Sequence, residues 1–299
     1  MGAQLKNGGF SEVRVRRGNH SLNVRDYPGV GPVFVLMHGF PDNLHIYDSL
    51  APLLASAGRR VVTLDFLGYG ESDKPDHYPY TASNLEGDLD AVVNGLDLGQ
   101  VIPVAHDASG PTAVNWALDH QAEVSSLALL NTYYAPSPTL CFPEFISLFA
   151  DPELTPLADA FQSDFSQFQW LLRFTQGQFT RGAPPEIRER AKVLIPMIGG
   201  QFAAKPSAFP AFRGLTRDLH VTLLKNAQRT GELASFPRPV GMIWGAGDPY
   251  LNRGVGEHLH GLFPGSTLRL LPYGHWPQID GPEDVAKLLL ELEGKSGTQ

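Results

Sequence analysis

Short runs of apolar residues alternate with segments of helical periodicity along most of the chain. Runs without internal polar residues are typical of parallel strands, because such strands are buried on both faces. The segments between them repeat apolar residues at helical spacing, which is typical of amphipathic helices. Strands are predicted at residues 32–39, 60–66, 101–105, 124–130, 240–244 and 267–271, and helices at residues 44–57, 85–98, 111–120, 254–263 and 282–293. The alternation predicts an α/β fold with a mostly parallel central sheet and helices on both faces.

Two segments depart from this alternation. Residues 12–27 alternate polar and apolar positions around Gly18-Asn19, which predicts a hairpin at one edge of the sheet. Proline-rich stretches at residues 133–138 and 236–239 enclose about a hundred residues with helical periodicity and no convincing strand. We therefore expect a core domain formed by residues 1–134 and 236–299, with residues 135–235 inserted as a helical cap.

A sharp turn is predicted where the strand at residues 101–105 ends. His106 and Asp107 follow the strand, residues 108–110 are small, and Pro111 begins a helical pattern. Small residues are required at a strand–turn–helix elbow because the two backbones pass close together, and the central residue adopts a strained conformation. The elbow therefore presents the carboxylate of Asp107. Pro103 breaks the usual rule for a central strand, since it lacks the N–H that a ladder requires.

Three polar residues follow three different strands, in the order Asp107, Asp248 and His275. The carboxyl ends of parallel strands lie at one edge of a sheet, so these side chains can meet there. An ionised carboxylate needs no base to attack an electrophilic carbon, and it would form an alkyl ester on Asp107. His275 could then activate a water that hydrolyses the ester, with Asp248 orienting the imidazole.

Five motifs carry a resemblance to a known family: HGFP at His38, GYGESDKP at Gly68, AHDASGP at Ala105, WGAGDP at Trp244 and GHWPQ at Gly274. In this order they resemble the α/β-hydrolase fold, and within it the group of epoxide hydrolases and haloalkane dehalogenases. The resemblance implies Asp107 as nucleophile, His275 as base and Asp248 as its orienting acid. It also implies an oxyanion hole made by the backbone N–H groups of Phe40 and Ala108.

Other interpretations of the same residues are open. Asp107 could simply cap the following helix, because aspartate is favoured there. Ser109 is a rival nucleophile for a serine-type esterase, although it would place Asp107 and Pro111 where small residues are expected. Asn131 occupies the position at which some dehalogenases carry their acid, but it cannot ionise, so Asp248 is preferred. A binding protein without turnover would need a defective triad, and the triad of this sequence is intact.

The leaving group is less determined than the nucleophile. In dehalogenases a Trp beside the nucleophile, together with an Asn or a second Trp, holds the halide, whereas this chain has Ala108 and Phe40 at the corresponding positions. Epoxide hydrolases usually protonate the epoxide oxygen from cap tyrosines, and residues 135–249 contain none. An epoxide hydrolase giving diols is the first expectation, and a haloalkane or haloacetate dehalogenase is the alternative. The substitute proton donors are His220, Tyr133, Tyr134 and Trp170, and the residues expected in an apolar substrate pocket are Phe145, Phe168, Phe212 and Trp276.

Composition excludes several classes of partner. The net charge of −8 and the lack of a long Lys/Arg run argue against binding to nucleic acid or an anionic membrane. The single cysteine, Cys141, allows neither an internal disulfide nor a cysteine-based metal site, and we expect no cofactor and no metal. No signal peptide or membrane span is predicted. These features favour a cytoplasmic monomer or homodimer that acts on a small apolar substrate.

Overall fold

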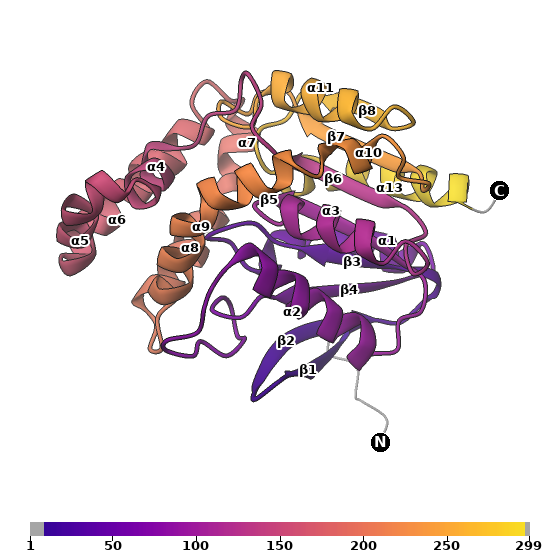
Figure 1. Ribbon diagram of the computed structural model, residues 1–299, viewed down its shortest axis with the longest axis horizontal. Helices are drawn as coiled ribbons and strands as arrows, with labels where there is room; N and C mark the ends of the chain where they lie inside the picture. Colours follow the sequence, from indigo (N-terminus) through magenta and orange to yellow (C-terminus); the bar gives the residue numbers. More distant parts are fainter. Residues whose placement is uncertain (1–8, 297–299) are drawn as a thin grey trace.

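The computed structural model describes residues 9–296 and contains an eight-stranded sheet with the order β1-β2-β4-β3-β5-β6-β7-β8 (Figure 1). β2 pairs antiparallel with both β1 and β4, and every other neighbouring pair is parallel. The strands are β1 (Ser11–Arg17), β2 (His20–Tyr27), β3 (Val30–Met37), β4 (Arg59–Asp65), β5 (Val101–Asp107), β6 (Leu127–Thr132), β7 (Val240–Gly245) and β8 (Thr267–Leu271). The predicted mostly parallel sheet and its edge hairpin are confirmed.

Burial of the strands follows their position in the sheet. β6 and β7 are buried at every residue, whereas the edge strand β1 buries only Val15. This difference explains why the central strands are continuous apolar runs and β1 alternates, because only central strands are covered on both faces.

Pro103 lies in β5 at a place where the ladder to β6 is interrupted. Val101 donates to Glu123 O and accepts from the N–H of Ser125, so it faces the β6 side. Pro103, two residues further, faces the same side, and continuous pairing with β6 begins only at Val104. The missing N–H therefore breaks no ladder hydrogen bond, which resolves the conflict noted in the sequence.

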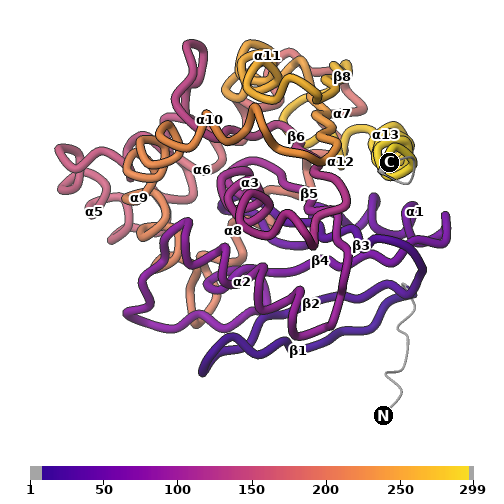
Figure 2. Tube along the Cα trace, turned by 45° about the vertical axis from the view of Figure 1, so that its right-hand side comes forward, coloured from indigo at the N-terminus to yellow at the C-terminus, as the bar shows by residue number. Residues whose placement is uncertain are grey.

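Helices cover both faces of the sheet. α1 (Leu50–Ser56) packs against α13 (Pro282–Ser296) on one face, and α2 (Ala82–Gly95) packs against α3 (Gly110–Asp119) on the other (Figure 2). The segment expected as one helix at residues 44–57 is instead a 3₁₀ turn, Leu44–Tyr47, followed by α1. The remaining core helices are α11 (Arg253–Leu262) and α12 (Pro277–Asp280).

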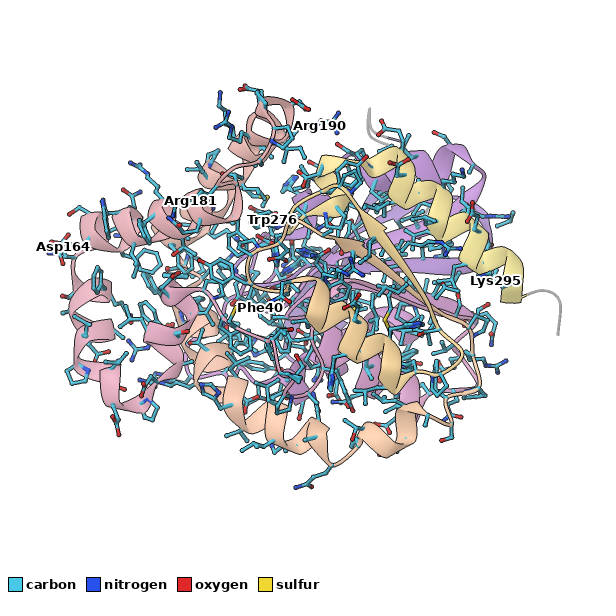
Figure 3. All side chains as sticks on the ribbon, turned by 90° about the horizontal axis from the view of Figure 1, so that it is seen from above. Phe40, Asp164, Arg181, Arg190, Trp276 and Lys295 are labelled. Carbon is cyan, nitrogen blue, oxygen red and sulfur yellow. The ribbon has the colours of Figure 1, made fainter. Side chains whose placement is uncertain are left out.

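Between β6 and β7 the chain contains only helices, 3₁₀ turns and loops. In Figure 1 most of these inserted helices lie to the left of the sheet, and Figure 3 shows Phe40 and Trp276 where they meet the core. Side-chain contacts join the two parts, for example the carboxylate of Asp218, which accepts from the N–H of Ala82 at 3.0 Å. The inserted helices are α4 (Glu144–Ala150), α5 (Thr155–Ser163), α6 (Phe165–Phe179), α7 (Pro185–Arg190), α8 (Leu194–Ala203), α9 (Phe209–Ala227) and α10 (Thr230–Leu233).

Within residues 9–296, no helix combines the length and the apolar character that crossing a bilayer requires. The expectation of no signal peptide concerns a segment whose residues 1–8 lie outside the described part of the chain.

Candidate active site

Asp107 lies at the elbow between β5 and α3. Its φ of 53° is in the left-handed region, which is strained for a residue with a side chain. The hydroxyl of Thr132 donates a hydrogen bond to the carbonyl of Asp107 and so holds the turn. A Cβ on residue 110 would lie 1.9 Å from that hydroxyl oxygen, which explains why this position after the elbow is occupied by Gly110. The strained elbow expected from the sequence is therefore present.

The loop after β3 brings backbone donors to the carboxylate of Asp107. Oδ1 accepts a hydrogen bond from the N–H of Phe40 at 3.1 Å, and the carboxylate also binds the N–H of Ala108. Gly39 allows this approach, because a Cβ there would lie 2.4 Å from the Cβ of Asp107. Both backbone groups that the resemblance implied as an oxyanion hole point at one carboxylate.

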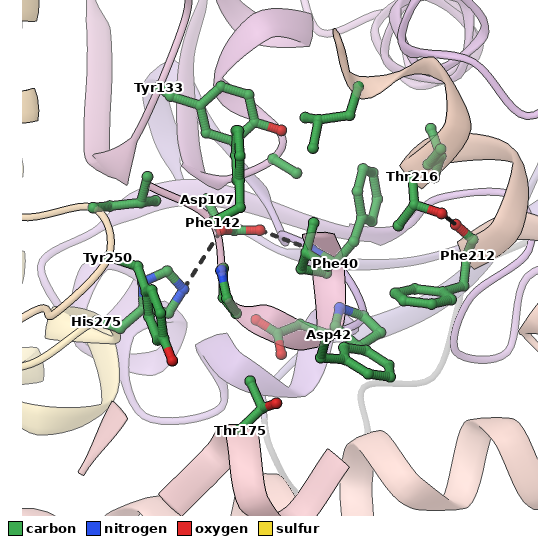
Figure 4. A pocket seen from close by; sticks show the side chains of 18 of the residues that line it. Phe40, Asp42, Asp107, Tyr133, Phe142, Thr175, Phe212, Thr216, Tyr250 and His275 are labelled. Atoms are coloured by element: carbon green, nitrogen blue, oxygen red, sulfur yellow. Dashed lines mark hydrogen bonds and ion pairs between the residues drawn. The ribbon is translucent and has the colours of Figure 1, made fainter. Parts of the chain in front are cut away.

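His275 and Asp248 complete a line of three side chains. The Nδ1–H of His275 donates to Oδ2 of Asp248 at 2.6 Å, and its Nε2 lies 3.6 Å from Oδ2 of Asp107 (Figure 4). His275 and Asp248 are buried, whereas the side chain of Asp107 is 19% exposed and faces a pocket. Three residues from three loops are thus within reach of one another in the order acid, imidazole, carboxylate.

Further hydrogen bonds hold the carboxylate of Asp248. Its Oδ1 accepts from the N–H groups of Tyr250 and Leu251, at 2.9 and 3.1 Å. Its Oδ2 accepts from Nδ2 of Asn131 at 3.0 Å, in addition to the bond from His275. Asn131, considered as a rival acid, is instead a neutral donor to the acid.

The charges of the site shift its pKa values. Burial lowers the pKa of His275, but the charge and hydrogen bond of Asp248, with the charges of Asp107 and Asp42, outweigh burial and raise the pKa to about 9. Burial raises the pKa of Asp107, against the opposing effects of His275 and of the two backbone N–H groups. The carboxylates around His275 thus favour its protonated form at neutral pH.

Asp42 is a pocket carboxyl that the sequence reasoning missed. It lies one residue after HGFP, is 3% exposed, and accepts a hydrogen bond from Nε1 of Trp276 at 3.0 Å. Burial raises its pKa to about 7, since the bond from Trp276 compensates only in part. The position of Asp42, directly after the HGFP motif, was the sequence signal that could have identified it as a site residue.

A largely apolar pocket opens in front of Asp107 and His275, between the core and the inserted helices (Figure 4). Of the four residues expected to line it, Phe145, Phe212 and Trp276 do so. Phe168 does not, because it packs among the inserted helices with its ring centroid 4.7 Å from that of Phe202. The lining also includes Asp42, Leu85, Pro111, Phe142, Ile146, Leu172, Thr175, Gln176, Phe179, Ile198, Asp218, Leu219 and Tyr250.

The four proposed proton donors differ in position. Tyr133 lines the pocket, and it lies on the opposite side of Asp107 from Asp42 in Figure 4. Tyr134 lies outside the pocket lining because its hydroxyl is bonded to Oδ1 of Asn115 at 2.9 Å. His220 and Trp170 are exposed on the inserted helices and are absent from the lining, since both point away from the core. The structure thus brings only Tyr133 of these four to Asp107.

Ser109 and His106 have structural contacts. The hydroxyl of Ser109 is fully buried, lies within 3.0 Å of the carbonyls of Met37 and His106, and accepts from the N–H of His106. The Nε2–H of His106 donates to the carbonyl of His275 at 2.8 Å, which supports the loop that carries the base. Neither side chain reaches the pocket.

Tyr250 also lines the pocket, although it was not considered from the sequence. Its hydroxyl donates to Oε2 of Glu144 at 2.8 Å, and burial followed by this bond raises the pKa of the phenol. Because its proton is engaged with Glu144, Tyr250 is less suited than Tyr133 to protonate a substrate.

Comparisons with known proteins identify the family to which the fold belongs. Residues 32–282 match the model of the α/β-hydrolase fold family. The chain is similar to bifunctional epoxide hydrolase 2 of Sus scrofa, with 27% identity over 88% of this chain and 51% of that one. It is similar to a fluoroacetate dehalogenase of a Burkholderia species, with 41% identity over 41% of each chain. Its fold resembles the crystal structure of epoxide hydrolase VrEH1 from Vigna radiata, with a TM-score of 0.75, 20% identity, and coverage of 97% of this chain and 99% of that one.

The resemblance read from the five motifs is thereby confirmed, and the family model covers the elbow, both acids and the histidine. The protein is a hydrolase of the α/β-hydrolase superfamily, and its chain belongs to the α/β-hydrolase fold family.

Proposed function

We propose that the protein is an epoxide hydrolase that converts neutral, largely apolar epoxides into vicinal diols through an alkyl ester on Asp107. The observation that carries this proposal is the phenol of Tyr133, which lines an otherwise largely apolar pocket together with Asp107 and His275. Burial, and then the negative charge of Asp107, raise the pKa of Tyr133 well above its usual value. The phenol therefore keeps its proton at neutral pH, as a donor to an epoxide oxygen must.

Ring opening uses the free oxygen of the nucleophile. Oδ1 of Asp107 is bound by the N–H of Phe40, so Oδ2 attacks the epoxide carbon. A carbon–oxygen bond forms to Oδ2 while the carbon–oxygen bond of the ring breaks, and the leaving oxygen takes the proton of Tyr133. The resulting phenolate regains a proton from solvent. Oδ1 becomes the carbonyl oxygen of the ester and lies already at the backbone donors.

Hydrolysis of the ester uses His275 as base. Formation of the ester removes the charge of Asp107, which is one cause of the raised pKa of His275, so the imidazolium releases its proton to solvent more easily and becomes neutral. His275 then takes a proton from a water that attacks Cγ of Asp107. The N–H groups of Phe40 and Ala108 stabilise the oxyanion, an arrangement worth roughly 3 to 4 kcal/mol per donor elsewhere. Collapse of the tetrahedral intermediate expels the diol, which receives the proton from His275.

A dehalogenase is the second candidate, supported by the relative from Burkholderia. Halide ions need N–H donors beside the nucleophile, and the side chains of Ala108 and Phe40 offer none. A haloacetate would also need a cation for its carboxylate, yet the described lining holds Asp42, Asp107 and Asp218 and neither Lys nor Arg. The charge of the pocket thus favours a neutral epoxide. Burial of Ser109 disfavours the serine esterase, and the geometry of Asp107 and His275 disfavours a purely binding role.

The test is mass spectrometry of a His275→Gln variant incubated separately with styrene oxide and with a bromoalkane. We expect an adduct of the epoxide on the peptide that contains Asp107, because the ester forms but its hydrolysis loses the base. The double variant Asp107→Asn/His275→Gln is the matched control and should carry no adduct. Adducts from both compounds would agree with the epoxide hydrolase, because Oδ2 can displace bromide without a proton donor. An adduct from the bromoalkane alone would favour the dehalogenase, and no adduct from either compound would refute the mechanism.

A further inference from the structure

Two neighbouring side chains of α6, Thr175 and Gln176, line the pocket without hydrogen-bond partners. They are 4% and 7% exposed, and the described residues offer no partner to Oγ1 of Thr175 or to Nε2 and Oε1 of Gln176. In Figure 4 the side chain of Thr175 lies below Asp107, on the same side as Asp42. Leaving a buried polar group without a partner costs about 1–3 kcal/mol, so three such atoms on two residues that line one cavity indicate a polar occupant.

The contacts of α6 place this polar pair on the same helix as a residue that touches the base. Phe179, one helical turn further along α6, packs on His275 with ring centroids 4.6 Å apart. One turn of helix advances about 5.4 Å, so Thr175 and Gln176 lie about one turn from Phe179, the residue that packs on the base. A small substrate that reacts at Asp107 can therefore extend along α6 as far as the pair. The group that meets the pair is therefore a second polar group of the substrate, a few bonds from the reacting carbon.

The chemistry of the pair defines that group. The amide of Gln176 both donates and accepts, and the hydroxyl of Thr175 does the same. The pocket holds three carboxyl groups, Asp42, Asp107 and Asp218, and no Lys or Arg among the described lining residues, so an anionic group is disfavoured. A hydroxyl or a carboxamide satisfies donor and acceptor together without bringing a negative charge.

We propose that Thr175 and Gln176 form a recognition site for a neutral hydroxyl or carboxamide group, so that the preferred substrates are epoxides with a second polar group rather than plain hydrocarbon epoxides. This inference rests on the proposed epoxide hydrolysis for its substrate class. The pair determines specificity and takes no part in bond making or breaking.

The experiment compares two epoxides of equal size, para-hydroxymethyl styrene oxide and para-ethyl styrene oxide, which differ only in a hydroxyl in place of a methyl. A site that hydrogen-bonds a substrate hydroxyl discriminates against the analogue that lacks it. We expect kcat/KM to favour the hydroxymethyl compound by about tenfold or more in the unmodified protein. The double variant Thr175→Val/Gln176→Leu should lose or invert this preference, mainly by faster turnover of the ethyl compound. Para-carboxy styrene oxide should be the poorest substrate of the unmodified protein.

The control is Gln167→Leu, which makes the same change at an exposed position of the same helix. It should leave the preference as it is. An equal preference in the unmodified protein and the double variant would overturn the proposal, and it would mean that water alone occupies the pair.

A binding measurement separates this proposal from the proposed reaction. Calorimetry with para-ethylbenzyl alcohol and para-diethylbenzene uses ligands that cannot react. Tighter binding of the alcohol, lost in the double variant, would support the recognition site even if no epoxide is hydrolysed. Equal binding of the two ligands would refute it even if epoxides are hydrolysed.

Discussion

The side-chain amide of Asn131 donates a 3.0 Å hydrogen bond to Oδ2 of Asp248, the same carboxylate oxygen that His275 binds. Asn131 also donates to the carbonyl of Gly245 and accepts from its N–H, so one amide ties β6 to the loop after β7. Its φ of 26° lies in the left-handed region, where asparagine is better tolerated than most residues. Asn131 therefore holds the acid in place.

Replacing Asn131 by Asp should destabilise the protein and lower its activity. The new side chain cannot donate to Asp248, and the two neighbouring carboxylates repel each other. Asn131→Gly removes every hydrogen bond of this side chain without adding a charge or backbone strain, and is the matched control. We expect a loss of about 1–3 kcal/mol in the free energy of unfolding for the glycine variant and a larger loss for Asp. Urea unfolding at neutral pH measures both, and an Asp variant as stable as the original would contradict this role of Asn131.

Hydrolysis of the alkyl ester should follow the ionisation of His275. The imidazole acts as base only when it is neutral, so the rate rises with pH through the pKa of His275. That pKa is about 9 when Asp107 is charged, and it should be lower in the ester because the charge of Asp107 is gone. Single-turnover kinetics between about pH 6 and about pH 10, with substrate mixed rapidly into excess enzyme, measures the midpoint of this rise. A hydrolysis rate that does not rise with pH in this range would contradict the role of His275 as base.

Substitution of Asp42 should shift the midpoint of the pH–rate profile of ester hydrolysis. The charge of Asp42 raises the pKa of His275, and Asp42→Asn removes it, so the rising limb of the profile should shift to lower pH. The exposed Asp97→Asn is the control, because asparagine tolerates the φ of 47° at that position. An unchanged midpoint in Asp42→Asn would show that the carboxyl of Asp42 does not act on His275.

Tyr133→Phe should slow epoxide opening much more than displacement of bromide. Removing a general acid typically costs roughly 10²–10⁴-fold when the leaving group needs a proton, and a bromide needs none. Formation of the ester in the His275→Gln background, followed by mass spectrometry over time, compares the two reactions. His220→Phe, which alters an exposed side chain, serves as control and should form the ester at the original rate. A Tyr133→Phe variant with full rates would exclude Tyr133 as donor.

Ser109→Ala should affect stability and not the chemistry. The buried hydroxyl lies within hydrogen-bonding distance of two carbonyls and also accepts an N–H, so we expect the free energy of unfolding to fall by about 1–3 kcal/mol. Turnover per folded molecule should stay close to that of the unmodified protein. Loss of ester hydrolysis in Ser109→Ala, with Asp107→Asn still active, would reverse this assignment and restore the serine mechanism.

The sequence by itself determined the elbow and the edge of the sheet at which the site lies. An apolar run, small residues after Asp107 and Pro111 at the start of a helix are local signals, and they were sufficient to predict the turn. Continuous apolar strands predicted a parallel sheet, and parallel strands end at one edge. Asp107, Asp248 and His275 could therefore be expected together before any distance was known.

Only the tertiary structure decided which side chains of the inserted helices reach the pocket. Tyr133 and His220 are both polar residues near the ends of the segment that contains the inserted helices. The packing of α9 turns His220 to the surface, whereas Tyr133 lines the pocket. Phe145 and Phe168 are both phenylalanines of the inserted helices, and of the two only Phe145 lines the pocket. The physical reason is that a helix has several partly apolar faces, and contacts with elements distant in sequence select the face that is buried. The same contacts place Thr175 and Gln176 opposite the core, where periodicity alone would have favoured apolar side chains.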